Sequence, residues 1–247
     1  MSTSEQMNFS IPSSLQQYLS RLDAFIESAI LPLQHSNDND RFFDHRREHS
    51  RTDWDAGGLP RHEWEALLSR AVHLADEAGF YRFNLPKRYG GQNADESGAR
   101  GANLWMAVIR EHLASKGLGL FNDLQNEHSV IGNFPDLVML MGFGNEEQKK
   151  MLIEGRLRRQ VRFVFGLTEP GHGSDATFME TRAKKESKDG VSGWRIDGRK
   201  MWQSGMPHAT HIFLFARTSG RNGQANGITC FIVPRKTKGV DIESYEW

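Results

Sequence analysis

The sequence predicts an α+β multidomain protein: an N-terminal all-α helical domain at residues 1–159, followed by an antiparallel β-barrel or β-sandwich domain at residues 160–247 that is truncated. Two observations support this fold class. Up to about residue 157, apolar residues recur at three- and four-residue spacing, which is typical of amphipathic helices. After residue 160, short segments rich in aromatic and β-branched residues are separated by turn residues, which is typical of strands.

Two long amphipathic helices open the helical domain. The first is expected at residues 15–30 and the second at residues 64–75, because each carries apolar residues along one face. The apolar residues of the first are Leu15, Tyr18, Leu19, Leu22, Phe25, Ile26 and Ile30. Those of the second are Trp64, Leu67, Leu68, Ala71, Val72 and Ala75. We expect both sets to form the core of this domain.

Two further helices are bounded by residues that cap helices. The third is expected at residues 102–117 and ends at a glycine, the residue that best terminates a helix. The fourth is expected at residues 144–155. There the side chain of Asn145 can cap the amide of Gln148, and Gly155 closes the helix.

The β domain contains five short predicted strands, at residues 161–167, 193–197, 199–204, 211–218 and 227–234. Asp197-Gly198 lies between two of them and can form a tight hairpin turn, whereas "TSGRNGQANG" forms a longer loop. The final segment, "GVDIESYEW", begins another strand and then stops. An antiparallel domain that ends in mid-strand would leave an exposed edge and an open core. We therefore expect the chain to be incomplete.

Composition excludes several classes of protein. Lys plus Arg and Asp plus Glu both number 31, so no basic excess favours binding to nucleic acid or to an anionic membrane. No apolar run reaches the roughly 18 residues of a transmembrane helix, and Cys230 alone cannot form an internal disulfide. The N-terminus lacks a targeting pattern, so we expect a cytoplasmic protein, with mitochondrial or peroxisomal import left open.

Metal binding is not expected. "HRREH", residues 45–49, fits the zinc pattern H-x-x-E-H, but charged residues on every side favour a solvated segment instead. The other histidines are scattered and fit no spacing of metal ligands. The sequence therefore predicts no metal site.

The stretch "GLTEPGHGSD", residues 166–175, is the strongest candidate for a ligand-binding loop. From Gly171 it also spells G-H-G-S-D-A, which fits the dinucleotide fingerprint of a Rossmann fold, and the residues after it could form a helix. Against that interpretation, no βαβ pattern follows, about 160 mostly helical residues precede the loop, and Pro170 interrupts the junction between strand and turn. We favour a different kind of loop.

Four segments in order carry a family resemblance: "FNLPKRYGG", "NEEQKKMLIEG", "FGLTEPGHGSD" and "KMWQSG". Together they resemble the acyl-CoA dehydrogenase family, the FAD flavoproteins that oxidise acyl-CoA thioesters. The resemblance covers residues 71–247 and is most specific in Thr-Glu-Pro-x-x-Gly-Ser-Asp. It implies an N-terminal helical domain, a middle β domain and a C-terminal four-helix domain, with flavin between the last two. The C-terminal helical domain is missing from this sequence.

The resemblance places the loop against flavin and acyl-CoA. Thr168 matches the threonine whose hydroxyl and amide donate to the pyrimidine side of the isoalloxazine, where negative charge develops on reduction. Phe165 and Leu167 match positions that line the ring, partly through their backbone. Taken alone, each of these residues would be assigned a structural role.

The second half of the loop is expected at the boundary between flavin and CoA. Gly171 and Gly173 would let the backbone approach the ligand closely, and Ser174 would bind cofactor phosphate or the pantetheine arm. The alternative is that the glycines only turn the chain, and that Ser174 or Asp175 caps the turn.

A second flavin segment is implied at Trp202, Gln203 and Ser204. Trp202 would pack on the ring, and Ser204 would place a hydroxyl near flavin N5, whereas the alternative makes Trp202 an ordinary core aromatic. The sequence departs from the family in two places. It has Trp-Gln-Ser-Gly where Trp-Ile-Thr-Asn is common, and His172 where a small residue is common. These departures put the chain length of the substrate in doubt.

The reaction implied is FAD-dependent α,β-dehydrogenation of an acyl-CoA substrate, with reoxidation by an electron acceptor of unknown identity. The base is usually a glutamate of the C-terminal domain, so no catalytic residue is assigned here, and Glu169 is expected to be a local structural anion. We expect the 247-residue chain alone to be inactive, and the full-length protein to form homo-oligomers. The alternatives are a related flavin oxidase or monooxygenase, or a naturally short protein that binds nucleotide or acyl-CoA or pairs with another subunit.

Overall fold

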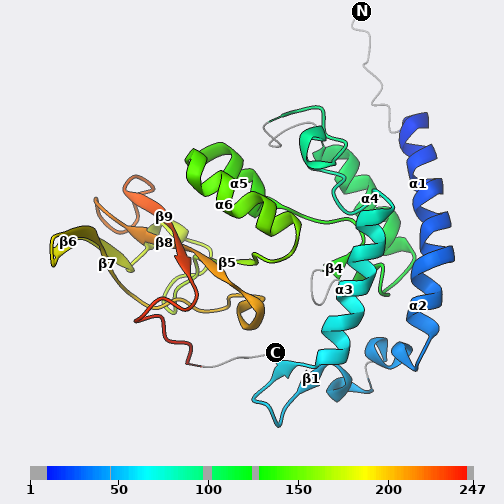
Figure 1. Ribbon diagram of the computed structural model, residues 1–247, viewed down its shortest axis with the longest axis horizontal. Coiled ribbons are helices and arrows are strands. Elements are labelled where there is room, and N and C mark those ends of the chain that lie inside the picture. Colours follow the sequence, from blue (N-terminus) through cyan, green and yellow to red (C-terminus); the bar gives the residue numbers. More distant parts are fainter. Residues whose placement is uncertain (1–9, 45, 97–101, 124–127, 244–247) are drawn as a thin grey trace, which may run out of the picture. The chain divides into compact units, whose positions relative to one another are not determined.

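The structure is a computed structural model that describes residues 10–44, 46–96, 102–123 and 128–243 (Figure 1). Contacts between residues divide the chain into two units. The first ends at Phe143 and the second begins at Gly144. We call them the helical unit and the β unit. The domain boundary expected at residue 159 differs from this division, because the helix that follows Gly144 groups with the strands.

Within the described residues, the helical unit contains five α-helices. Their bounds are α1 (Ser13–Phe25), α2 (Leu31–His35), α3 (His62–Glu77), α4 (Asn103–Ser115) and α5 (Pro135–Phe143). A π-helical turn, Ile26–Ile30, joins α1 to α2. Short 3-10 turns lie at Asn39–Phe43, Glu48–Ser50 and Lys87–Tyr89. The two-residue strands β1 (Thr52–Asp53) and β2 (Leu59–Pro60) pair with each other, as do β3 (Asn122–Asp123) and β4 (His128–Ser129).

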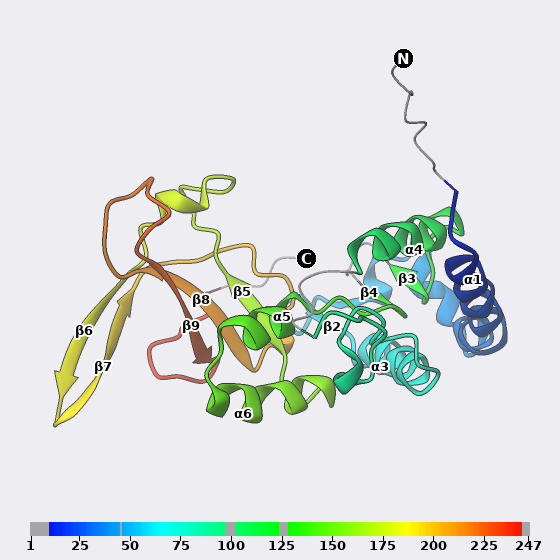
Figure 2. The ribbon, with the colours of Figure 1, turned by 90° about the horizontal axis from the view of Figure 1, so that it is seen from above.

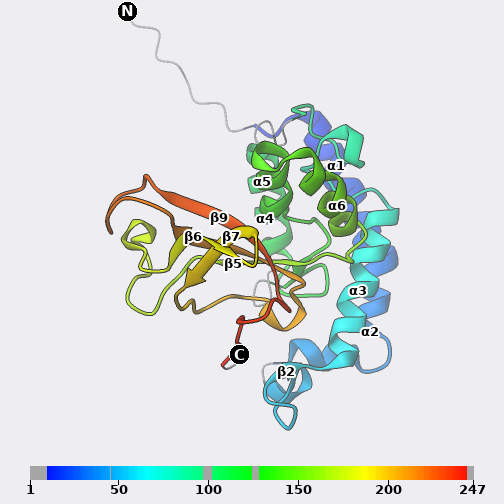
Figure 3. The same cartoon turned by 60° about the vertical axis from the view of Figure 1, so that its left-hand side comes forward.

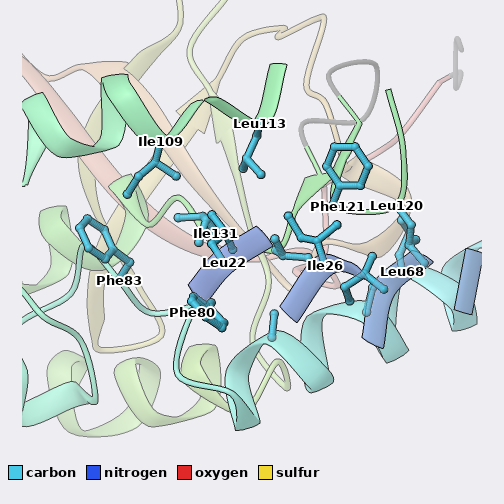
Figure 4. Packing of buried hydrophobic residues seen from close by; sticks show 14 of the residues in the cluster. Leu22, Ile26, Leu68, Phe80, Phe83, Ile109, Leu113, Leu120, Phe121 and Ile131 are labelled. Carbon is cyan, nitrogen blue, oxygen red and sulfur yellow. The ribbon is translucent and has the colours of Figure 1, made fainter. Parts of the chain in front are cut away.

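The core of the helical unit is the apolar set that periodicity predicts. Leu22 and Ile26 face Leu68 of α3 and Ile109 and Leu113 of α4, and all five are buried (Figure 4). In Figure 3, helices α1, α3 and α4 lie side by side around this cluster. The apolar stripe of each helix is buried against the other two, which is the main source of helix stability in a folded protein.

Two features of the helical unit escape periodicity. Helix α5 is apolar on nearly every side, so no 3.6-residue stripe marks it in the sequence. The π-helical turn ends two residues before Pro32, which has no N–H to donate to the preceding turn. The first predicted helix therefore continues beyond residue 30 to His35.

Helix α6 (Glu146–Leu157) begins with the expected cap. The side chain of Asn145 accepts from the amide of Gln148 at 2.8 Å, and the Gln148 side chain accepts from the amide of Asn145 at 2.9 Å. This is a capping box. The expected end at Gly155 is wrong, since the helix continues to Leu157. Gly155 instead permits close packing, because a Cβ there would lie 2.7 Å from a methyl group of Val161.

The β unit contains one five-stranded sheet. Its strands are β5 (Phe163–Gly166), β6 (Arg182–Lys188), β7 (Val191–Asp197), β8 (His211–Arg217) and β9 (Ile228–Pro234), in the order β5-β8-β6-β7, with β9 also paired to β8. The pairs β6–β7 and β8–β9 are antiparallel. However, β5 runs parallel to β8, and β6 meets β8 in one parallel bridge. The α+β class is confirmed, and the sheet is mixed where an antiparallel one was expected.

The hairpin of the β unit lies one Asp-Gly dipeptide earlier than expected. The turn between β6 and β7 is Asp189-Gly190, with φ values of 51° and 79°, which suit a two-residue hairpin turn (Figure 2). Asp197 ends β7, and residues 199–204 form no strand. The expected Asp197-Gly198 hairpin is therefore wrong. Strand β6 was not recognised, because its charged sequence lacks an alternating apolar pattern.

Two other expectations concern the whole chain. Within the described ranges, no helix is both long and apolar enough to cross a membrane. The last described residues, 240–243, form no strand, and the remainder of the strand expected there lies outside the described residues. Cys230 is half-buried in β9, and burial raises the pKa of its thiol to about 11.

Candidate functional site

The loop at residues 166–175 leaves the end of β5 and turns back on itself at once. The amide of Glu169 donates to the carbonyl of His172 at 3.2 Å, and the amide of His172 donates to the carbonyl of Glu169 at 3.1 Å. Pro170 and Gly171 occupy the centre of this tight turn, where proline is favoured as the second residue. One 3-10 turn, Ala176–Phe178, and then β6 follow. No helix starts at the fingerprint glycines, so the Rossmann interpretation is wrong.

A buried ion pair holds this loop. Glu169 and Lys200 lie 2.8 Å apart, and their side chains are 4% and 10% exposed. The carboxylate of Glu169 also accepts from the backbone amides of Glu180 at 2.7 Å and Thr181 at 2.9 Å. Burial by itself raises the pKa of Glu169, but the hydrogen bonds from Lys200, Thr181 and Glu180 outweigh burial and lower that pKa to about 2. Glu169 is thus a structural anion, as expected.

The same ion pair joins the two segments expected to contact flavin. The ammonium group of Lys200 donates to the carbonyl of Leu167 at 3.1 Å, and the amide of Met201 donates to the carbonyl of Thr168 at 3.0 Å. Segments that are over thirty residues apart in sequence therefore run together on either side of Thr168. Sequence reasoning missed Lys200, because "RKMWQS" was interpreted as a strand and no role was assigned to its lysine.

Three hydroxyl groups of these segments are uncommitted. In the part of the chain that the structure describes, the side chains of Thr168, Ser174 and Ser204 make no hydrogen bond. Thr168 is half-buried, and the two serines are exposed. A hydroxyl can both donate and accept, so these groups are available to a polar ligand.

Trp202 adopts an unusual conformation. Its φ is +64°, in the left-handed region that bulky residues rarely occupy, and its side chain is 67% exposed. The alternative that Trp202 is a core aromatic is therefore wrong. A strained backbone that presents a large exposed aromatic ring is typical of functional positions. Next to it, the side-chain amide of Gln203 donates through Nε2 to the carbonyl of Met201, so this side chain is used locally.

The two apolar site residues are half-buried, and the ring of one of them packs on the sheet. Phe165 and Leu167 are half-buried, and the ring of Phe165 lies 5.5 Å from that of Phe213 and 6.4 Å from that of Phe215. The aromatic side chain of Phe165 is thus part of the packing of β5 on β8, which lie next to each other in Figure 2.

The glycines of the loop do not have positive φ values, so backbone conformation alone does not require them. A Cβ at Gly173 would meet no described atom, and one at Gly171 would lie 3.7 Å from the carboxylate of Glu180. Asp175 caps the next turn, since its carboxylate accepts from the Thr177 amide at 3.0 Å. The capping role considered for Asp175 is confirmed, whereas Ser174 takes no part in it.

Within the described residues, no group of three His, Cys, Asp or Glu side chains could hold a metal ion. Of the H-x-x-E-H pattern, His45 lies outside the described residues. His49 lies in the short 3-10 turn Glu48–Ser50.

Known proteins are similar to this chain in sequence. Residues 164–246 match the family model for the acyl-CoA dehydrogenase middle domain. A 3-(aryl)acrylate reductase of Clostridium sporogenes is 33% identical over 165 residues, which is 66% of this chain and 39% of the relative. A glutaryl-CoA dehydrogenase of Desulfococcus multivorans is 24% identical over 243 residues, which is 97% of this chain and 52% of the relative. The chain thus spans about half the length of the curated relatives it matches, or less.

The fold is also shared with solved structures. An acyl-CoA dehydrogenase of Bacillus anthracis, solved in complex with FAD, matches with a TM-score of 0.57 and 22% identity. The match covers 98% of this chain and 34% of that one. This likeness confirms a fold in which a helical part precedes a β part.

Proposed function

Since this chain belongs to the acyl-CoA dehydrogenase family through its middle domain, residues 164–246, we propose that residues 166–175 and 199–205 bind FAD. The protein that contains them is an oxidoreductase that forms the α,β-double bond of an acyl-CoA thioester. One observation carries this proposal. The Lys200–Glu169 pair brings the two segments together and leaves the hydroxyl groups between them uncommitted.

The residues present fit a flavin. The hydroxyl of Thr168 is available to the pyrimidine side of the ring, and that of Ser204 to the region of N5. Trp202 offers an exposed aromatic face. Ser174, beside a glycine whose Cβ would meet nothing, is free to bind phosphate or pantetheine. The side chains of Gln203 and Phe165 have partners within the protein, the carbonyl of Met201 and the ring of Phe213. Leu167 contributes the backbone carbonyl that accepts from Lys200.

When bound, FAD accepts the hydride that leaves the β-carbon of the substrate. The chain's own part is to bind and orient the cofactor and to hold donors where negative charge develops. Thr168 is positioned for this by its carbonyl bond to Met201. Glu169 does not act as the base, because both carboxylate oxygens accept hydrogen bonds and its pKa is about 2. No described residue is assigned to proton removal.

A second candidate is the reverse reaction. The relative from Clostridium sporogenes is named a 3-(aryl)acrylate reductase, and it is 33% identical over 165 residues. A flavin that takes up hydride from a β-carbon can also return it to an activated double bond, with the same residues around the ring. On this alternative the substrate is an α,β-unsaturated aryl acid or its thioester. Both candidates include exchange of electrons with a further partner, an acceptor for the dehydrogenase or a donor for the reductase. Both also include assembly of the protein into homo-oligomers.

Anaerobic titration of the FAD-loaded, full-length protein that contains these segments distinguishes the two. Loss of the visible flavin absorbance on addition of a saturated acyl-CoA supports the dehydrogenase. Chemically reduced flavin that is reoxidised by an aryl acrylate, with no bleaching by any acyl-CoA, supports the reductase. Thr168→Val removes only the hydroxyl and should weaken FAD binding about tenfold. Ser192→Ala, on the distant hairpin, is the matched control. Absence of FAD binding in the wild-type protein contradicts both candidates.

A further inference from the structure

Arg217, the last residue of β8, is a further charged side chain buried in the β unit, and it is 1% exposed. Its guanidinium makes five hydrogen bonds, all to backbone carbonyl groups. Within the described residues it has no carboxylate partner. The acceptors are Met179 at 3.3 Å, Ser219 at 3.3 Å, Asn226 at 3.1 Å, Thr177 at 2.6 Å and Gln224 at 2.9 Å. Such full use of the planar fork is a geometry that lysine cannot reproduce.

These five carbonyl groups belong to two different segments. Thr177 and Met179 lie just after the candidate cofactor loop, and the other three lie in the loop at residues 218–227, which joins β8 to β9. The amide of Gly223 also donates to the carbonyl of Thr177 at 2.9 Å. Gly227 closes the loop so tightly that a Cβ there would lie 2.2 Å from the carbonyl oxygen of Ser219. The guanidinium therefore fastens one segment to the other.

Arg217 and Glu169 hold the same stretch of backbone from opposite sides. Glu169 accepts from the amides of Glu180 and Thr181, whereas Arg217 donates to carbonyl groups two and four residues before Thr181. The amide of Arg217 also donates to the carbonyl of Thr181 at 2.8 Å. A buried anion thus binds the N–H groups and a buried cation binds the C=O groups, which satisfies the backbone of a segment without regular strand partners.

Ser174 depends on this arrangement. It is exposed and makes no hydrogen bond of its own within the described residues, so its position is set by the chain on either side: the turn at Glu169–His172 before it and the segment that begins at Asp175 after it. Asp175 in turn binds the amide of Thr177, whose carbonyl is held by Arg217. We propose that Arg217 is a positioning residue that fixes Ser174 and the 218–227 loop for ligand binding, without touching the ligand. This inference rests on the proposed function, because it assigns Ser174 to the cofactor or the pantetheine arm.

The first test measures order in the chain without ligand. Arg217→Lys keeps the charge but has three donors in place of five, and Arg217→Met removes the charge. Arg221→Lys and Arg221→Met, at an exposed arginine of the same loop, are the controls. We expect amide hydrogen exchange to rise about tenfold or more at residues 174–181 and 218–227 in both Arg217 variants. Exchange in α1, α3 and the β8–β9 pair should stay unchanged. Exchange that rises throughout the sheet would make Arg217 a general determinant of folding and overturn the proposal.

The second test measures binding of FAD and of coenzyme A by titration. Arg217→Lys should weaken binding of coenzyme A about tenfold, and the Arg221 variants should bind like the wild type. If the wild type binds and Arg217→Lys binds equally well, the positioning role is wrong and the proposed function stands. If the wild type binds neither ligand, the proposed function fails and the inference fails with it, even where the exchange data show local loosening.

Discussion

The two units of the chain are stabilised in different ways. The helical unit has a large apolar cluster in which Leu22, Trp64, Ile109 and Leu113 are buried almost completely. The β unit has a small apolar cluster around Val164, Ala209 and Ile212, and its site loops depend on charged side chains that bind backbone groups. Burial of apolar area tolerates many sequences, whereas a polar network requires each partner. The β unit, which carries the candidate site, is therefore expected to tolerate fewer substitutions at its polar contacts than the helical unit does in its core.

The largest effect is expected in the helical core. Trp64 is 1% exposed, its ring lies 5.1 Å from that of Phe42, and the guanidinium of Arg51 lies 4.4 Å from its centre. Trp64→Ala should lower the free energy of unfolding of this unit by about 4 kcal/mol. Trp54→Ala is the control, since Trp54 is 51% exposed. Amide hydrogen exchange in increasing urea, measured separately for the helical unit and the β unit, gives the effect of both variants. Equal loosening of the two units would contradict the contrast between them.

The polar network should be nearly as sensitive. Glu169→Gln leaves the ammonium group of Lys200 buried without a carboxylate, which should destabilise the β unit by about 3 kcal/mol. Lys200→Met should cost a similar amount, and the double variant should cost less than the sum, because it removes both charges. Additive effects in a double-mutant cycle, measured by urea unfolding, would show that the two groups do not act as a pair.

Acid should loosen the β unit before the helical unit. The folded-state pKa of Glu169, about 2, is lower than its usual value of 4.5, so its contribution is present above about pH 5 and is lost as the pH falls toward 2. By about pH 3 the loss should reach about 2 kcal/mol. The free energy of unfolding of the wild type and of Glu169→Gln, measured at about pH 5 and about pH 3, isolates the contribution of this carboxylate. A wild-type pH dependence that persists in the variant would point to another group.

The smallest expected effect is an increase in the stability of the β unit. Trp202 has φ of +64°, a conformation that asparagine adopts at low cost. Trp202→Asn should therefore raise the stability of the β unit by about 1 kcal/mol while it weakens binding of FAD. Trp194→Asn is the control. That residue packs on Phe231 at 5.4 Å within the sheet, and its replacement should destabilise the β unit. A loss of stability in both variants would show that Trp202 is packed rather than strained.

The sequence predicts the helical unit well, because a single period locates a buried face. The stripe from Leu15 to Ile30 and the cap at Asn145 each depend on residues within a few positions of one another. Helix α5 was missed since an element that is apolar on all sides has no stripe. In the β unit, two Asp-Gly dipeptides could each form the hairpin turn, Asp189-Gly190 and Asp197-Gly198. Only the pairing of β6 with β7 shows that the first of them does.

The candidate site was predicted in part, by motif rather than by contact. The motif indicated Thr168, Ser174 and Ser204, and the structure leaves their hydroxyl groups uncommitted. It assigned no role to Lys200 or Arg217, whose hydrogen bonds to the candidate loop and to the segment after it reach across more than thirty residues. A lysine or arginine beside a strand is usually at the surface, so its burial follows only from the tertiary structure.

The central claim is that residues 166–175 and 199–205 form one cofactor site. Hydrogen exchange of this chain with and without FAD tests it most directly. We expect FAD to slow exchange in both segments together, with no change in the β6–β7 hairpin or in helices α1 and α3. Exchange that FAD leaves unchanged in both segments, or slows only elsewhere in the chain, would contradict the claim.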